Sequence, residues 1–289
     1  MCVNESLLCF EEFITLRLNP KQKLPKIDSD GSQLYYCVEG EGQPPIVFLH
    51  PLPFDHRIWT HQIFEFSFNH KVFALDFPGL GYSKLAARPC TISSLSNDLT
   101  NLMKIEGIDH AVIVGLSLGG AVAQQFALKS PEKVDTLILA GTSCSYGADE
   151  IQKKFSDRIL QYQSAGAREH YVSNLKILFS SKFAESEQGK SIIRNYASFS
   201  TRIDFGSVAR LFSSLLSFDI EEEIGSIKVP TLVIAGDEDR AFSDSKKISE
   251  KIPNAKFFPI HGAGHVVCYE KPALFNSAIA EFLDSSLIN

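Results

Sequence analysis

Short apolar runs, each followed by turn-forming residues, recur along the chain and predict strands. The first is an alternating run at 34–38, which is closed by the turn sequence Gly-Glu-Gly-Gln-Pro-Pro. The later runs are continuous, as expected for strands that are covered on both faces of a sheet. They lie at 46–49, 72–75, 111–114, 136–140, 231–235 and 256–260.

Segments of helical length lie between most of these runs. They cover 57–66, 92–106, 118–129, 242–252 and 272–286, and Pro272 suits the first turn of the last segment. Strands that alternate with helices predict an α/β fold with a mostly parallel sheet and helices on both faces. Sites in such sheets form at the carboxyl ends of the strands. Residues just after each run are therefore the first candidates for chemistry.

The alternation breaks between residues 145 and 218. We find no strand pattern there, and apolar residues recur at helical spacing, as in Val208, Leu211 and Leu215. We therefore predict three parts. These are an N-terminal extension at 1–25, a core formed by 26–144 and 219–289, and a helical cap insertion at 145–218.

Charge and composition narrow the classes of function. The 289 residues include 44% apolar side chains, enough for a large core, and 28 basic against 34 acidic side chains give a net charge of −6. No run rich in Lys and Arg appears, so nucleic acid is not expected as a partner. No apolar stretch reaches the roughly 18 residues of a membrane span, and the apolar patch at 7–10 lacks the basic flank of a signal peptide.

The six cysteines are scattered along the chain without C-x-x-C spacing. This pattern argues against a zinc site and against a disulfide framework. We therefore expect reduced thiols and a cytoplasmic protein.

A serine with glycines on both sides is the central chemical signal. The stretch Gly-Leu-Ser-Leu-Gly-Gly at 115–120 joins the strand predicted at 111–114 to the helix predicted at 118–129. A nucleophilic serine needs an exposed Oγ, and a sharp strand-to-helix turn exposes it. Side chains in place of the flanking glycines would clash across so tight a turn. The alternative is a glycine-rich turn in which Ser117 only caps the helix.

A nucleophilic serine also needs a base and an acid, in the chain order Ser, Asp or Glu, His. His261 and His265 are the histidines that follow the predicted insertion. We favour His265 because it lies in a glycine-containing loop beyond the last predicted strand, whereas His261 is closer to that strand. Asp237, Glu238 and Asp239 all follow the preceding strand, and spacing alone does not choose among them.

Five motifs in one order resemble the α/β-hydrolase superfamily, in its branch of small esterases, perhydrolases, enol-lactonases and carbon-carbon bond hydrolases. They are His-Pro-Leu-Pro at 50–53, Asp-Phe-Pro-Gly-Leu-Gly-Tyr-Ser at 76–83, the serine turn, Gly-Asp-Glu-Asp at 236–239, and Gly264-His265 followed by Glu270-Lys271-Pro272. The resemblance covers about residues 30–287 and implies the α/β-hydrolase fold. In the family pattern Gly-x-x-Asp the acid falls on Asp239, and Asp237 remains the alternative.

The resemblance also implies an oxyanion hole, formed by the backbone N–H groups of Leu118 and Leu52. This chain has His50-Pro51 where the family has His-Gly. Proline donates no N–H, so within 51–53 only Leu52 can donate, and the family pattern places the donor there as well. The departure therefore leaves the predicted hole intact.

Other residues have structural roles as their simplest interpretation. We expect the residues at 76–83 to form a structural turn that ends the preceding strand. We expect Asp55 to cap a helix that begins near Ile58. The insertion contains phenylalanines that could line an acyl pocket, although packing within the cap is the simpler expectation for any one of them. They include Phe179, Phe183, Phe199 and Phe212.

Together these residues predict a serine hydrolase that cleaves a small or medium carboxylic ester or lactone. Ser117 forms the acyl-enzyme, His265 is the base and Asp239 is its acid; neither metal nor cofactor is expected. A carbon-carbon bond or enol-lactone hydrolase and an acyltransferase are alternatives with the same triad. A ligand-binding receptor on a hydrolase body is an alternative of another class. The sequence leaves the substrate and the oligomeric state open.

Overall fold

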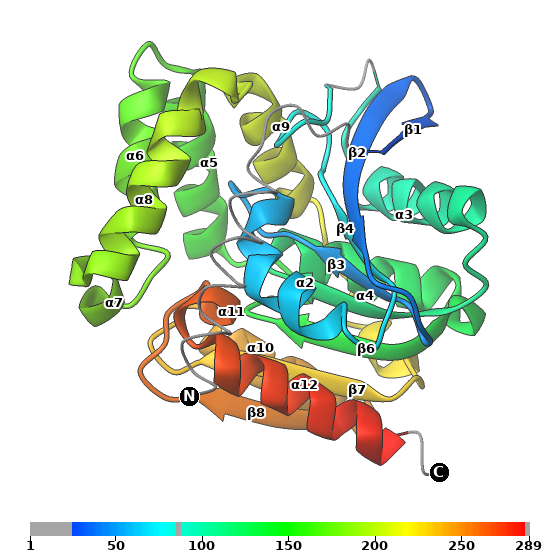
Figure 1. The fold of residues 1–289 in the computed structure, drawn as a ribbon. Helices are drawn as coiled ribbons and strands as arrows, with labels where there is room; N and C mark the ends of the chain where they lie inside the picture. The colour runs from blue at the N-terminus through cyan, green and yellow to red at the C-terminus, as the bar shows by residue number, and fades with distance from the viewer. Residues whose placement is uncertain (1–24, 85–87, 287–289) are drawn as a thin grey trace, which may run out of the picture.

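The structure, a computed structural model, describes residues 25–84 and 88–286 (Figure 1). Within these residues eight strands form one sheet, and its order is β1-β2-β4-β3-β5-β6-β7-β8. The strands are β1 (Lys26–Ser29), β2 (Ser32–Glu39), β3 (Ile46–Leu49), β4 (Val72–Leu75), β5 (Ala111–Leu116), β6 (Val134–Ala140), β7 (Thr231–Gly236) and β8 (Lys256–Ile260). β2 pairs antiparallel with β1 and β4, and all the remaining pairs are parallel. The predicted mostly parallel sheet is confirmed.

The apolar runs at 46–49, 72–75 and 111–114 lie in β3, β4 and β5 in the interior of this sheet, whereas the run at 256–260 forms β8, an edge strand with mostly exposed residues. Every residue of β3, β4 and β5 is buried, which explains why these strands carry no alternation of apolar and polar residues. The strands predicted at 46–49, 72–75 and 256–260 match β3, β4 and β8 at both ends. β1 was not predicted, because its sequence Lys-Ile-Asp-Ser has only one apolar residue and forms through its hairpin with β2.

Helices cover both faces of the sheet, as predicted. α2 (Thr60–Phe66) and α12 (Pro272–Ser286) pack together on one face, and α3 (Ile92–Glu106) and α4 (Leu118–Lys129) pack together on the other (Figure 1). The remaining elements of the core are α10 (Phe242–Lys251), α11 (Val267–Glu270) and the 3-10 turns η1 (His56–Trp59), η2 (Pro131–Lys133) and η4 (Ile224–Ser226). The helix predicted from residue 57 is therefore split, because η1 precedes α2. Asp55 caps η1 as expected, since its side chain accepts a hydrogen bond from the Arg57 N–H at 3.0 Å.

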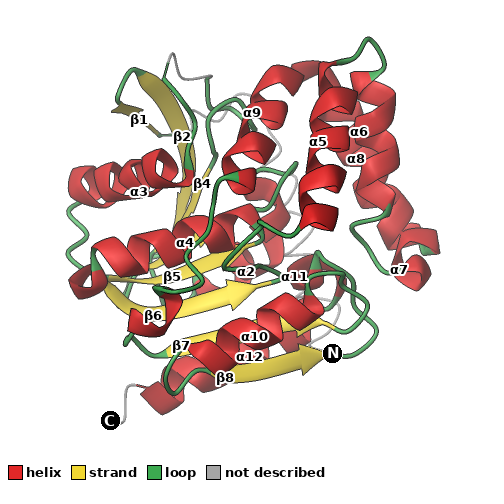
Figure 2. Cartoon of the chain, turned by 180° about the vertical axis from the view of Figure 1, so that it is seen from behind, coloured by secondary structure: helices red, strands yellow, loops and turns green. Residues whose placement is uncertain are grey.

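Five α-helices lie between β6 and β7, in the segment where the sequence predicted helices only. They are α5 (Asp149–Gln163), α6 (Ala167–Lys176), α7 (Ser181–Glu185), α8 (Glu187–Phe199) and α9 (Phe205–Leu216), with the 3-10 turn η3 (Ser200–Arg202) before α9. Figure 2 shows α5, α6 and α8 on the side to which the arrowheads of β6, β7 and β8 point. α5 packs against α9, where the rings of Phe155 and Phe212 meet edge to face at 5.3 Å. That this segment is a separate cap domain stays a prediction.

One arginine joins α8 to the loop after β3. The guanidinium of Arg57 lies 3.8 Å from the ring centroid of Phe199, at the end of α8. Asp55 holds that guanidinium in place, because the Arg57 Nε donates a hydrogen bond to it at 2.7 Å. The stacked arginine and its aspartate therefore fix one contact between the helical segment and the sheet.

Some of the sequence predictions concern residues that lie outside the described ranges. The N-terminal extension at 1–25, with its apolar patch and two of the cysteines, lies outside the described residues except for Pro25. Cys90, Cys144 and Cys268 are buried free thiols. Among the helices of residues 25–84 and 88–286, none combines the length and the apolarity that crossing a bilayer would require.

Candidate active site

Ser117 lies at a sharp turn between β5 and α4. Its backbone has φ 55° and ψ −113°, a conformation that residues other than glycine rarely adopt. Three hydrogen bonds hold this backbone: its N–H donates to the Ala140 carbonyl at 2.9 Å, and its carbonyl accepts from the Thr142 hydroxyl at 2.9 Å and from the Ala121 N–H at 3.0 Å. The strained turn leaves the Ser117 side chain half-buried at the wall of a cavity.

The glycines around the serine are required by close approach, as the sequence predicted. A Cβ at Gly115 would lie 2.3 Å from the carbonyl oxygen of Gly119, on the other side of the turn. No real Cβ contact is that short, so a side chain would force the strand and the helix apart. The tight turn therefore depends on glycine at this position.

Asp239 and His265 come together from the loops after β7 and β8. The Nδ1 of His265 lies 2.9 Å from one carboxylate oxygen of Asp239 and 3.0 Å from the other. The Ala241 N–H donates a further hydrogen bond to Asp239 at 3.0 Å. His265 and Asp239 line the same cavity as Ser117, so the structure brings all three predicted residues to one place.

The pKa values of this pair shift in the directions that an ion pair produces. Burial alone would raise the pKa of Asp239, but the attraction and hydrogen bond of His265 outweigh it and the pKa is lowered. Burial alone would lower the pKa of His265, but the attraction and hydrogen bond of Asp239 outweigh it and the pKa is raised. The positive charge of Arg158 lowers the pKa of His265, and the negative charge of Glu270 raises it. A carboxylate bonded to Nδ1 leaves Nε2 as the nitrogen that can take a proton from a nucleophile.

The alternative residues for acid and base pair with each other instead. Asp237 accepts a hydrogen bond from the Gly262 N–H at 2.7 Å and lies 2.9 Å from the Nδ1 of His261. The His261 side chain is 85% exposed, against 16% for His265. Asp237 and His261 therefore form a surface pair that closes the turn after β8.

The two candidate donors of the oxyanion hole are Leu118, which follows Ser117 in the chain, and Leu52, which lies on the same cavity wall. Leu118 is the first residue of α4, so its N–H lies outside the ladder of helical hydrogen bonds. Leu52 lines the cavity together with Ser117. The buried ring of His50 supports the loop that carries Leu52, because its Nδ1 bonds the Pro51 carbonyl at 3.0 Å and its Nε2 accepts from the Phe77 N–H at 3.0 Å.

A buried carboxylate, Glu270, joins the histidine loop to the helical segment. It accepts hydrogen bonds from the Gly264 N–H at 2.9 Å, from the Ser180 hydroxyl at 2.6 Å and from the Ser180 N–H at 3.2 Å. Gly264 lies so close to this segment that a Cβ there would be 2.5 Å from the Ser180 nitrogen. Burial raises the pKa of Glu270, and the hydrogen bonds from Ser180 and Gly264 partly oppose that rise.

The cavity that these residues line has a volume of about 390 Å³. This volume lies at the lower end of the range that is typical of small-molecule sites. Its wall is partly apolar, with Tyr146, Ile151, Phe155, Ile177, Leu178, Phe212 and Leu215, and partly charged, with Lys154, Asp157, Arg158, Arg240 and Asp244. Of the four phenylalanines considered as a pocket lining, only Phe212 is on this wall.

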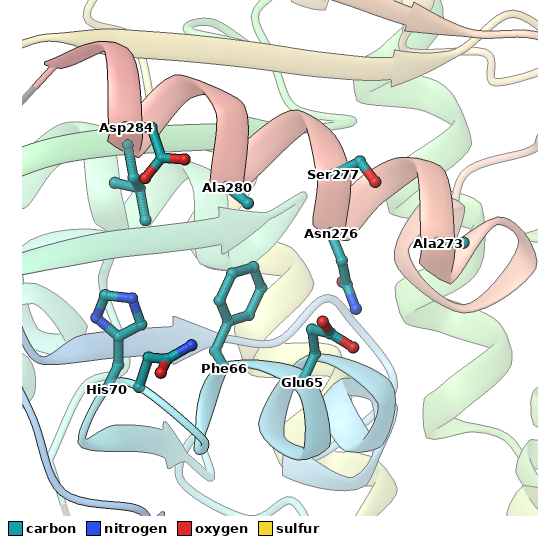
Figure 3. Close-up of a pocket in the computed structure, with 10 residues that line it drawn as sticks. Glu65, Phe66, His70, Ala273, Asn276, Ser277, Ala280 and Asp284 are labelled. Carbon is teal, nitrogen blue, oxygen red and sulfur yellow. The ribbon is translucent and has the colours of Figure 1, made fainter. Parts of the chain in front are cut away.

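Other clusters in the described residues do not extend this site. One group of three side chains, Asp55, His56 and Asp76, has atoms close enough to hold a metal ion, but each already has a partner. Asp76 lies 2.8 Å from the His56 Nδ1 and accepts from the Tyr82 N–H at 3.0 Å, so this cluster shapes the turn after β4. A second cavity of about 410 Å³ lies between α2 and α12, far from Ser117 in the chain and without any of the three residues on its wall (Figure 3).

Three residues near the site carried no functional role in the sequence prediction. His50 and Glu270 stand in the motifs quoted for the family resemblance, but their hydrogen bonds join segments far apart in the chain. Arg158 gave no signal at all, because a single arginine in a helical stretch is ordinary. Only the packing of α5 over the strand ends brings it to the cavity.

Comparison with known proteins supports the same family. The alpha/beta hydrolase fold family matches residues 44–272. The chain is 24% identical to 3-oxoadipate enol-lactonase 2 of Acinetobacter baylyi over 85% of this chain and 91% of the relative. It is 23% identical to the pimeloyl-[acyl-carrier protein] methyl ester esterase of Pectobacterium atrosepticum over 86% of this chain and 98% of the relative. The crystal structure of the enol-lactonase from Burkholderia xenovorans superposes with a TM-score of 0.83 at 25% identity, over 90% of this chain and all of that one.

Proposed function

Because the chain belongs to the alpha/beta hydrolase fold family, which matches it from residue 44 to residue 272, we propose that it is a serine hydrolase of small or medium carboxylic esters or lactones. The observation that carries this proposal is the hydrogen bond between Asp239 and His265 at the wall of the cavity that Ser117 also lines. Nucleophile, base and acid then follow the chain order Ser, Asp, His of this architecture.

In the proposed cycle Ser117 Oγ attacks the acyl carbon while His265 Nε2 takes its proton. The tetrahedral intermediate collapses, and the alcohol leaves with the proton that His265 returns to it. Water then attacks the acyl-enzyme while His265 takes a proton from it. When this second intermediate collapses, the acid is released and His265 returns the proton to Ser117 Oγ. Asp239 stays ionised throughout and stabilises the imidazolium.

The negative charge that develops on the carbonyl oxygen needs donors. We assign this role to the N–H groups of Leu52 and Leu118, one from each side of the nucleophile. The positive end of α4 lies at the same place and favours the same charge. The ring of His50 keeps the Leu52 loop in position through the Pro51 carbonyl.

The helical segment at 145–218 acts as a cap in this proposal. Residues of α5, α6 and α9 form much of the cavity wall, so they limit the length of the acyl or alcohol group that can enter. The names of two relatives, both enol-lactonases, support the lactone part of the proposal. A carbon-carbon bond hydrolase or an acyltransferase would use the same three residues with another bond or another acceptor.

Labelling with a fluorophosphonate, which reacts only with an activated serine, tests the nucleophile. Wild type should be labelled, and Ser117→Ala should not. Ser143→Ala is the matched control, because Ser143 lines the same cavity but donates its hydroxyl to the Ser145 carbonyl at 2.6 Å. That variant should label like wild type. Labelling that persists in Ser117→Ala would overturn the assignment.

Turnover of a panel of methyl and p-nitrophenyl esters tests the activity itself. Ser117→Ala and His265→Ala should each lower the rate by about three orders of magnitude or more, since the triad acts as one unit. Circular dichroism spectra should stay the same as for wild type. A labelled wild type that turns over no ester or lactone would favour an acyltransferase. A receptor on the same fold would show neither labelling nor turnover.

A further inference from the structure

The cavity wall carries a cation, Arg158, that forms no ion pair with any residue in 25–84 and 88–286. Arg158, in the third turn of α5, lines the cavity with Ser117 and His265 and is half-buried. Its guanidinium lies 5.6 Å from the ring centroid of Phe212, on α9. The aromatic face and the aliphatic wall around it remove the guanidinium from much of the surrounding water.

Within the described part of the chain, no ion pair or hydrogen bond joins Arg158 to a carboxylate. The other half-buried arginines form ion pairs, Arg57 with Asp55 and Arg88 with Asp98. The exposed Arg210 is also paired, with Asp204. Burial lowers the pKa of Arg158; Tyr162 opposes this shift and the nearby cation of Arg240 adds to it. A desolvated cation without a partner is unfavourable, and proteins rarely keep one without a reason.

The acidic residues on the same wall do not take this role. Asp239 is bonded to His265, and Asp244 lies 3.9 Å from Lys247 on its own helix. Asp157 precedes Arg158 and is exposed, and adjacent residues of a helix do not face each other. The guanidinium therefore stays open to the cavity.

Arg158 also lies on the same cavity wall as the reacting groups Ser117 and His265. Its charge lowers the pKa of His265, against the effect of Asp239. A group bound at Arg158 therefore shares the cavity of about 390 Å³ with an acyl carbon at Ser117. A planar guanidinium matches a carboxylate with two parallel hydrogen bonds.

We propose that Arg158 binds a carboxylate carried by the substrate, so that the preferred substrates are half-esters of dicarboxylic acids or lactones that bear a carboxylate. This inference rests on the proposed hydrolase function and deepens it. It makes the charged group, rather than apolar chain length, the main determinant of specificity. The apolar wall then holds the methylenes between the carboxylate and the ester.

Matched substrates separate the charge from the shape. Monomethyl succinate, glutarate and adipate carry one free carboxylate, and the dimethyl esters of the same acids are neutral and of nearly the same length. We measure kcat/KM for each by proton release at constant pH. Wild type should prefer at least one half-ester to its dimethyl ester.

The variants then assign that preference to one side chain. Arg158→Met keeps the length and removes the charge, and it should lower the ratio of half-ester to diester kcat/KM by about 10- to 100-fold, mainly through KM. Arg158→Lys, which keeps the charge without the planar fork, should fall between the two. Lys153→Met is the matched control, because Lys153 is an exposed cation of the same helix outside this cavity wall. It should leave the ratio unchanged.

Each outcome decides between the inference and the function on which it rests. If Ser117 is labelled and the diesters are hydrolysed, but Arg158→Met leaves the ratio unchanged, the inference is wrong and the proposed function stands. The same conclusion follows if wild type rejects every half-ester. A fall of the ratio in Arg240→Met with no fall in Arg158→Met would move the carboxylate site to Arg240 and overturn the assignment. If wild type is neither labelled nor active, the proposed function fails and the inference fails with it.

Discussion

The backbone of Ser117 allows a stability prediction that is independent of catalysis. Its φ of 55° with ψ of −113° lies in the mirror image of the extended region. Only glycine enters this mirror region freely. Such a conformation costs a residue with a Cβ about 1–3 kcal/mol. Ser117→Ala keeps the Cβ and therefore the strain, whereas Ser117→Gly removes both.

The expected difference follows from two opposing terms. Glycine relieves the strain of about 1–3 kcal/mol but adds conformational freedom to the unfolded chain, which costs about 0.5–1 kcal/mol. We therefore expect Ser117→Gly to be more stable than Ser117→Ala by about 1 kcal/mol. Both variants lack the hydroxyl, so the comparison cancels any contribution from it.

Urea unfolding, followed by tryptophan fluorescence of the buried Trp59, measures this difference. With a slope of about 3 kcal/mol per molar urea, the midpoint of Ser117→Gly should lie about 0.3 M above that of Ser117→Ala. Both variants should be inactive. The reasoning is refuted if the alanine variant proves equally stable or more stable, because the turn would then carry no strain.

Three further predictions concern activity. Asp239→Asn should lower kcat on a neutral ester by about 10⁴-fold, and Asp237→Asn by less than about threefold; the reverse order would make Asp237 the acid. The base must be neutral to act, and Asp239 holds the pKa of His265 up against burial and Arg158, with Glu270 assisting. The acid limb of the kcat/KM profile should therefore lie above pH 6.5, the usual value for histidine, and a limb below it would contradict the ion pair. Across a series of p-nitrophenyl esters, activity should peak at short or middle chain lengths, since the cavity holds about 390 Å³; a steady rise through palmitate would mean that the pocket is open.

The core of the fold follows from the sequence because local pattern and tertiary environment agree there. β3 and β4 are buried on every residue, so a continuous apolar run was sufficient to find both their ends. β1 has no such run, and its position depends on pairing with β2. The 3-10 turn before α2 was also missed, because the same apolar spacing fits either kind of helix over a few residues.

The candidate site was predictable where it follows strand ends, and not where it depends on packing. Ser117, Asp239 and His265 each come just after a parallel strand, so their meeting could be expected from the order of elements. Spacing did not distinguish Asp237 from Asp239, because both follow β7; a surface partner, His261, separates them in the structure. Arg158 reaches the cavity through the packing of α5, which no local pattern encodes.

Glu270 has a consequence for how the molecule fluctuates. Its carboxylate holds the amides of Ser180 and Gly264, which are 84 residues apart in the chain, in one hydrogen-bonded unit. Neither amide can open to solvent without disturbing the other, so their hydrogen exchange with deuterium should proceed at similar rates. The loop of His265 and the start of α7 therefore belong to one cooperative unit of local unfolding.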